Sequence, residues 1–208
     1  LFECGFSFAP HINGKYACYA LSYAGGATLK WFRDNFSDKS YAELDKTVGD
    51  TPTGLLIMPH FAGAATPYMD TGSKAAIIGL TFEHTKSDIY KALMEGTAHE
   101  IAVNIETLKK YSLVPQKLVA TGGGARSAVW LQIKADVLGV PVAALDNREV
   151  GAAGTAYLAG KAIGIYPEGM RLASITAVYK PNKDKHKIYR EQFKKYAKIY
   201  GMSKQILG

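Results

Sequence analysis

The sequence predicts an α/β fold in which a mixed sheet carries a hairpin at one edge and helices on both faces. Three observations predict it. Two alternating, aromatic-rich runs stand at the start of the chain, short apolar runs alternate with helical patterns after them, and glycines lie where the runs end. Alternating strands and helices favour parallel strand pairs, whereas an initial hairpin makes the sheet mixed. The chain has no internal repeat or low-complexity linker, so we expect one domain over 1–208.

The first half of the chain begins with the predicted hairpin. Residues 1–10 and 16–23 alternate in the manner of strands, and the turn between them is His11-Ile12-Asn13-Gly14. The hydrophobic pattern then predicts helices over 27–36 and 40–49, a buried strand over 55–58, and an irregular segment over 59–79. That segment is rich in Gly, Ala and Pro and too long for a simple connection, so we interpret it as a functional or packing loop.

The longest predicted helix begins at Thr85 and runs for about 25 residues. Asp88, three positions on, completes a capping box. The pattern after it predicts a strand over 118–120, a helix over 127–138 that ends at Gly139, a strand over 140–145 and a helix over 151–160. The last of these helices is rich in small residues, so we expect it to pack closely against a neighbour.

The net charge of +7 does not indicate nucleic-acid binding, because of where the charge lies. Much of the excess falls between 180 and 204, where lysines surround aromatic residues at i, i+4, i+7 and i+11, namely Tyr189, Phe193, Tyr196 and Tyr200. This spacing puts the aromatics on one helical stripe, which we interpret as a packing face with the lysines solvated opposite. We therefore expect no nucleic-acid partner.

Other features of composition favour a cytoplasmic protein without a membrane partner. No apolar run approaches the ~20 residues that span a bilayer, and no basic segment followed by an apolar one marks the start. Cys4 and Cys18 lie in no C-x-x-C pattern, so we expect reduced thiols. The five histidines show no metal-ligand spacing, so we expect no metal site made by protein side chains alone.

The most informative stretch is residues 119–127, which read VATGGGARS. A short strand, a glycine turn and a helix start follow one another here. Glycines let the backbone lie close to a flat base, ribose or phosphate, and a helix start offers unpaired N–H donors. The order therefore predicts a nucleotide or another anion as ligand. An ordinary tight turn fits equally well, since the stretch is neither a P-loop nor G-x-G-x-x-G.

The segment over 119–164 resembles the C-terminal domain of FGGY-type carbohydrate kinases, the xylulokinase and glycerol kinase family. Three stretches carry the resemblance, namely the GGGARS turn, ADVLGVPV over 135–142 and GAAGTAYLAG over 151–160. Further landmarks match in the family's order: YAGG over 23–26 before a helix with Trp31, GLL over 54–56 leading to Pro59, the loop over 63–70 and GLT over 79–81. The resemblance covers nearly the whole chain and implies the ribonuclease H-like, actin-like ATPase fold, in which two such domains flank a cleft.

The resemblance also implies which residues contact the nucleotide. In this family the C-terminal domain holds the adenosine half of ATP. Gly123 and Gly124 would face the adenine, and Ser127 would lie near its edge. Gly26 and Lys30, one helical turn apart, match a second nucleotide-contacting pair. Lys30 departs from the amide side chain that glycerol kinases have at this position, which puts its role in question.

Each of these residues also has a structural interpretation. Gly26 suits close packing of a helix on a strand, Lys30 a solvated surface lysine, and Ser127 a helix N-cap. We interpret Arg126 and Asp136 as surface or helix-stabilising charges.

The activity implied by the resemblance is that of an ATP-dependent sugar kinase. Such an enzyme transfers the γ-phosphate of ATP to a terminal hydroxyl of a small ketose or polyol, and Mg²⁺ arrives with the nucleotide. The sugar-binding domain and the catalytic aspartate would precede Leu1, so we expect no catalytic residue in this chain and no activity of the isolated fragment. In the loop over 63–70, Ala64-Ala65 replace the Glu-Arg common in xylulokinases, which makes xylulose a less secure substrate. We expect Asp70 to cap its own turn.

Two alternatives stay open at this point. One is an ATP-binding regulatory or chaperone-like module of the same superfold, without sugar kinase activity. The other is an interaction domain in which the glycines are only structural. The sequence also leaves open whether the protein forms a homodimer.

Overall fold

The computed structural model describes residues 2–146 and 149–207. Its elements in the first half of the chain are η1 (Phe2–Cys4), β1 (Ser7–Pro10), η2 (Ile12–Gly14), β2 (Tyr16–Tyr19), α1 (Gly25–Phe36), α2 (Tyr41–Asp45), β3 (Leu56–Met58) and β4 (Ala76–Ile78). The elements that follow are α3 (Lys86–Lys109), β5 (Leu118–Ala120), η3 (Gly123–Arg126), α4 (Ala128–Leu138), β6 (Val142–Leu145), α5 (Val150–Ala162), β7 (Ile175–Tyr179), α6 (Lys183–Tyr196) and α7 (Ile199–Leu207). The α/β composition is as predicted.

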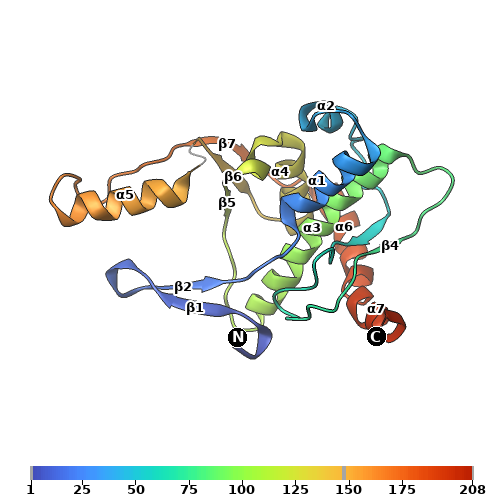
Figure 1. The fold of residues 1–208 in the computed structure, drawn as a ribbon, viewed down its shortest axis with the longest axis horizontal. Helices are drawn as coiled ribbons and strands as arrows, with labels where there is room; N and C mark the ends of the chain where they lie inside the picture. The colour runs from blue at the N-terminus through green and yellow to red at the C-terminus, as the bar shows by residue number, and fades with distance from the viewer. Residues whose placement is uncertain (1, 147–148, 208) are drawn as a thin grey trace.

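The strands do not form the single sheet that the sequence predicts. The described residues form three sheets: the antiparallel hairpin β1-β2, the antiparallel pair β3-β4, and the mixed sheet β5-β6-β7, in which β5 and β6 are parallel and β6 and β7 antiparallel. The hairpin extends away from the mixed sheet (Figure 1). The prediction of a hairpin at a sheet edge is therefore wrong, because alternation along a strand indicates its faces and not its partner.

The prediction of helices on both faces of the sheet is also wrong for the described residues. Helix α4 covers one face, where Leu131 and Ala135 pack against Val142 and the neighbouring strands. On the opposite face of the outer strands, Val119 and Val178 are about half exposed, at 50% and 51%.

Helix α5 lies apart from the other helices (Figure 1). Its only buried residue is Gly160, where an added Cβ would come within 2.3 Å of the Tyr166 ring. Leu158 on the same helix is 44% exposed. The expected close packing is therefore confined to one residue, because small residues permit a close approach without specifying what approaches.

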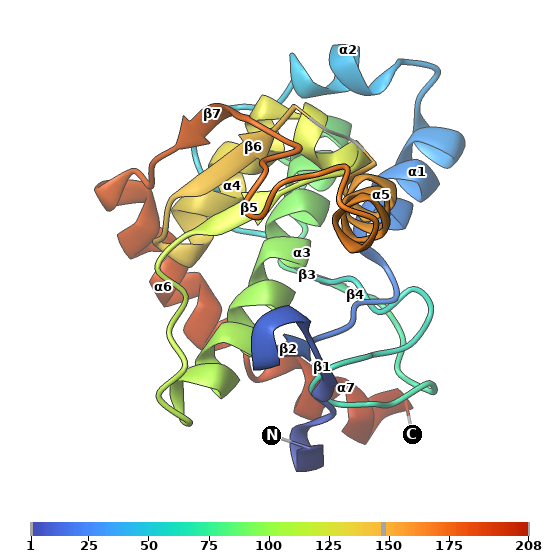
Figure 2. The same ribbon diagram turned by 90° about the vertical axis from the view of Figure 1, so that its left-hand side faces the viewer.

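Helix α3 forms the centre of the fold, with α1 and α4 beside it (Figure 2). Its capping box is the predicted one: the Thr85 side chain accepts from the Asp88 amide, and the Asp88 carboxylate accepts from the Thr85 amide. The principal core cluster joins it to its neighbours through Phe32, Ile57, Tyr90, Leu93, Met94, Trp130 and Tyr189, among others. Strand β3 lies so close to it that a Cβ added to Gly96 would stand 2.2 Å from the Ile57 carbonyl oxygen.

The predicted aromatic stripe near the end of the chain is a packing face. Tyr189 and Tyr196 of α6 are buried, and Phe193 and Tyr200 are partly buried against Met58. The stripe is divided between α6 and α7, because the first helix ends at Tyr196. Its role is the structural one that the sequence predicts.

The segment between β3 and α3 packs against the rest of the chain and includes the short strand β4, which the sequence does not indicate. The Thr66 hydroxyl donates to the Gly5 carbonyl and accepts from the Leu21 amide, so this segment connects to the base of the hairpin. Asp70 caps its own turn as expected, since Oδ1 accepts from the Gly72 amide at 3.0 Å.

Candidate functional site: the cavity at the glycine turn

The three glycines after β5 differ in what holds them in place. Gly122 has φ +76°, a left-handed conformation that favours glycine. Gly124 packs on Trp130, where a Cβ would lie 2.9 Å from Cζ3 of the indole. Gly123 has no protein atom within 4 Å of the place its Cβ would occupy. Packing therefore explains Gly124 and leaves the space above Gly123 open.

The open space above Gly123 belongs to a cavity of about 510 Å³. Four of the five residues that the resemblance assigns to the nucleotide line it together, namely Gly26, Gly123, Gly124 and Ser127. Its volume falls in the usual range for small-molecule sites, about 300 to 1,000 Å³. The structure thus brings together residues separated by about a hundred positions in the sequence.

Ser127 lies at the junction between the turn and α4. Its Oγ accepts a hydrogen bond from the Trp130 amide at 3.0 Å and so caps the helix. The predicted N-cap is confirmed, and the same residue lines the cavity.

Gly26 lies in the first turn of α1, at the other side of the cavity. The N-cap residue of this helix, Ala24, makes no side-chain cap. Peptide N–H groups at such a helix start are suited to hydrogen-bond an anion or a polar ligand atom. A Cβ on Gly26 would meet no protein atom within 4 Å.

Lys30 is not among the residues that line the cavity. Its ammonium pairs instead with Asp34 on the same helix, and its side chain is 66% exposed. The hydrogen bond from Lys30, together with that from Arg33, lowers the pKa of the Asp34 carboxyl. The nucleotide contact of Lys30 stays a prediction.

The remaining cavity wall contains residues that the sequence did not single out. Leu29, Tyr90 and Trp130 give it an apolar floor, and helix α2 contributes Tyr41, Ala42 and Asp45. The apolar side chains could be read from the sequence only as core residues, since nothing local distinguishes a cavity floor from a packed interior. The wall from α2 has no sequence signal, because only the tertiary fold brings this short helix to the same cavity as the glycine turn.

The two charged residues that the sequence assigned to the surface or to helix stabilisation lie in different environments. Arg126 is exposed, as expected, and it also lines the cavity. Asp136 is 2% exposed, and its Oδ1 accepts from the Gln132 side chain and the Asn182 amide. Burial between α4 and the start of α6 makes Asp136 an interior acceptor.

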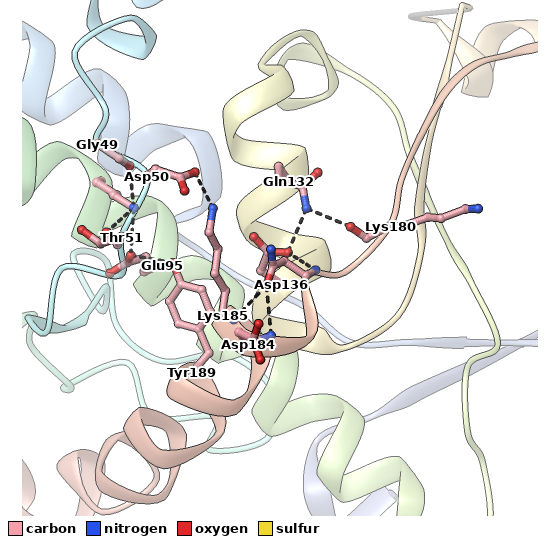
Figure 3. A network of polar contacts seen from close by, with 12 residues as sticks. Gly49, Asp50, Thr51, Glu95, Gln132, Asp136, Lys180, Asp184, Lys185 and Tyr189 are labelled. Atoms are coloured by element: carbon pink, nitrogen blue, oxygen red, sulfur yellow. Dashed lines mark hydrogen bonds and ion pairs between the residues drawn. The ribbon is translucent and has the colours of Figure 1, made fainter.

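A polar network supports the segment that connects α2 to β3 (Figure 3). The Lys91 ammonium donates to the carbonyl oxygens of Gly49, at 2.7 Å, and Thr51, at 2.5 Å. It also lies 3.9 Å from the buried carboxylate of Glu95, which accepts from the Tyr189 hydroxyl at 2.7 Å. Burial lowers the pKa of Lys91 and raises that of Glu95. The network ties this connecting segment to α3 and α6.

Within residues 2–146 and 149–207, no three or more His, Cys, Asp or Glu side chains cluster in a way that could hold a metal ion. Across the same residues, no helix is long and apolar enough to cross a membrane.

Comparison with known proteins assigns the chain to a family. Residues 7–163 match the model of the FGGY family of carbohydrate kinases, C-terminal domain. The match covers more than half of the chain, which therefore belongs to this family of carbohydrate kinases.

Among individual relatives, the chain is 28% identical to a xylulose kinase from Staphylococcus epidermidis over 207 residues, which is 96% of this chain and 42% of that protein. It is 35% identical to a glycerol kinase from Deinococcus radiodurans over 156 residues, or 73% of this chain and 31% of that protein. The crystal structure of a xylulose kinase from Lactobacillus acidophilus shares the fold, with a TM-score of 0.83, 24% identity, and coverage of 95% of this chain and 43% of that one. The chain thus spans less than half the length of these relatives.

Proposed function

We propose that this chain is the nucleotide-binding domain of a carbohydrate kinase that transfers the γ-phosphate of ATP to a terminal hydroxyl of a small ketose or polyol. The observation that carries the proposal is the cavity at Gly123. An apolar floor and exposed glycine backbone suit the flat face of a purine, and the side chain missing from Gly123 leaves room for it. The family and the names of the relatives, xylulose kinase and glycerol kinase, support the acceptor class.

The proposed role of this chain is to bind and orient the nucleotide. In the reaction the γ-phosphoryl group passes from the β,γ-bridging oxygen to the acceptor hydroxyl, the hydroxyl proton passes to a base, and ADP leaves. Such a transfer depends on positioning and charge neutralisation, with Mg²⁺ carried by the nucleotide. The predicted nucleotide-contacting residues include no carboxylate to serve as that base. We place the base and the sugar contacts in the remainder of a longer protein, which closes over the cavity and excludes water.

The test is a calorimetric titration of ADP into the 208-residue chain and into its Gly123→Val variant. The Cβ of the branched side chain would meet no protein atom within 4 Å, so we expect the fold to persist and ADP affinity to fall at least tenfold. Gly201→Val in α7 is the matched control, since a Cβ there also meets open space and lies outside the cavity. Equal ADP affinity in the folded Gly123→Val variant would remove the basis of the proposal.

A further inference from the structure

Helix α2 brings a carboxylate to the cavity. Asp45 lines the cavity from the end of this helix and is half-buried. The Tyr90 hydroxyl, whose side chain rises from α3, donates to Oδ1 of Asp45 at 3.0 Å. Burial, followed by the nearby Asp45 charge, raises the pKa of Tyr90, so this hydroxyl keeps its proton and its donor role. The contact fixes the orientation of the carboxylate.

Supporting contacts keep α2 in this position. A capping box between Ser40 and Glu43 closes the start of the helix. Just after its end, the Ser87 hydroxyl lies 2.9 Å from the hydroxyl of Thr47 and also donates to the Thr47 carbonyl. The network around Lys91 then holds the next residues against α3 (Figure 3). Asp45 is therefore presented by an element that is anchored on both sides.

Among the described residues that line the cavity, Asp45 is the one carboxylate, and the other polar side chains are hydroxyls, an indole N–H and the cationic Arg126. The Ser127 hydroxyl oxygen accepts from the helix backbone, and the Trp130 indole N–H donates to the Met94 carbonyl oxygen and the Thr97 hydroxyl. Arg126 offers only donors. In the described part of the chain, the side-chain hydrogen bond of Asp45 involves Oδ1, so the lone pairs of Oδ2 stay available to a ligand in the cavity that this residue lines.

We propose that Asp45 determines the base specificity of the cavity, with Oδ2 accepting a hydrogen bond from the 6-amino group of adenine. This inference rests on the proposed nucleotide-binding function. A 6-oxopurine such as hypoxanthine would set a carbonyl oxygen against the carboxylate, which is repulsive. Guanine's adjacent N1–H and N2–H donors match two carboxylate oxygens side by side, and the Tyr90 hydroxyl already takes one lone pair of Oδ1, which weakens this paired contact. The arrangement thus selects adenine over both 6-oxopurines.

The experiment measures the dissociation constants of ADP, IDP and GDP with the 208-residue chain by calorimetry. We expect ADP to bind about tenfold or more tightly than IDP or GDP, the effect of one hydrogen bond to a charged group. In Asp45→Asn, the side-chain amide can donate to a 6-carbonyl, so the preference should fall below about threefold or reverse. Asp38→Asn is the matched control: it removes an exposed carboxylate outside the cavity and should keep the wild-type preference.

The outcomes separate this inference from the function on which it rests. Equal binding of ADP and IDP by the unmodified chain, or tighter binding of GDP, would overturn the role of Asp45 and leave the nucleotide site in place. An unchanged ADP preference in a folded Asp45→Asn variant, checked by circular dichroism, would also overturn it. Failure of all three nucleotides to bind would reject the proposed function itself.

Discussion

The imidazole of His99 provides a quantitative test of the fold through pH. This residue of α3 is 1% exposed, and neither ring nitrogen has a hydrogen-bond partner in the described structure. Its ring stacks on Tyr196 at a centroid distance of 4.9 Å and lies near Tyr189 and Phe193. Burial lowers the pKa of His99 from 6.5 to about 4. The native state therefore holds a neutral imidazole that the unfolded chain protonates more readily.

The sign and size of the effect follow from this difference. Above pH 6.5 both states are neutral and His99 contributes no pH dependence. As the pH falls below 6.5 the unfolded state gains a proton that the native state does not, so stability is lost at about 1.4 kcal/mol per pH unit until the pH approaches the folded pKa. Between pH 8 and pH 5 the loss due to His99 is about 2 kcal/mol.

The measurement is urea unfolding of the wild-type chain and of His99→Leu at pH 8 and pH 5, followed by circular dichroism. The difference in unfolding free energy between the two proteins should change by about 2 kcal/mol in favour of the variant on going to pH 5. Other titrating groups cancel in this comparison. His11→Gln, a change at an exposed turn residue, serves as the control. A difference between wild type and His99→Leu that is independent of pH would refute the buried neutral imidazole.

Three further outcomes test the packing, the helix cap and the division of function. Gly96→Ala should destabilise the chain by about 3 kcal/mol or more, because its methyl group would stand 2.2 Å from the backbone of Ile57. The control Gly154→Ala has open space around it and should be neutral or slightly stabilising. Equal urea midpoints of the two variants would contradict this packing. Ser127→Ala should cost about 1 kcal/mol of stability by removing the cap of α4, and an unchanged thermal midpoint would show that the cap is dispensable. The isolated chain should consume no ATP with xylulose, glycerol or related polyols in a coupled ADP assay, and sugar-dependent turnover would place the catalytic base within it.

The features that could be predicted from the sequence are those with local causes. Thr85 and Asp88 form a capping box because the partners are three residues apart, and Gly139 ends α4 in the left-handed conformation with φ +68°. The glycine turn between β5 and α4 could be predicted because its motif and its neighbours follow one another along the chain, and its role as a ligand site stays a prediction. The capping box, the helix end and the glycine turn each depend on a few residues that are close together in the sequence.

The features that could not be predicted depend on partners distant in the chain. The alternation of residues in β1 and β2 predicted strands but not that they pair only with each other, and the small residues of α5 predicted a close neighbour that the described chain supplies only at Gly160. Asp45 illustrates the same limit at the site. Its place in the same cavity wall as Gly123 depends on α2, which contacts Tyr90 of α3 through Asp45 and is followed by the contact between Ser87 and Thr47.

The packing of the loop over 63–70 bears on how its difference from the xylulokinase motif is interpreted. Ala64 and Ala65 replace two charged residues common in xylulokinases, which by sequence alone suggested a different sugar. In the structure their exposed fractions are 1% and 5%, and the Ala64 backbone pairs with Asp70 in an antiparallel bridge. Asp70 is held in turn by the Tyr200 hydroxyl at 2.8 Å, which stabilises this packing. Charged side chains at these two positions would start from buried backbone sites, and burying a charge is costly unless it is paired. Burial therefore explains why small apolar residues stand at these two positions, and the alanines alone do not argue against xylulose as the acceptor.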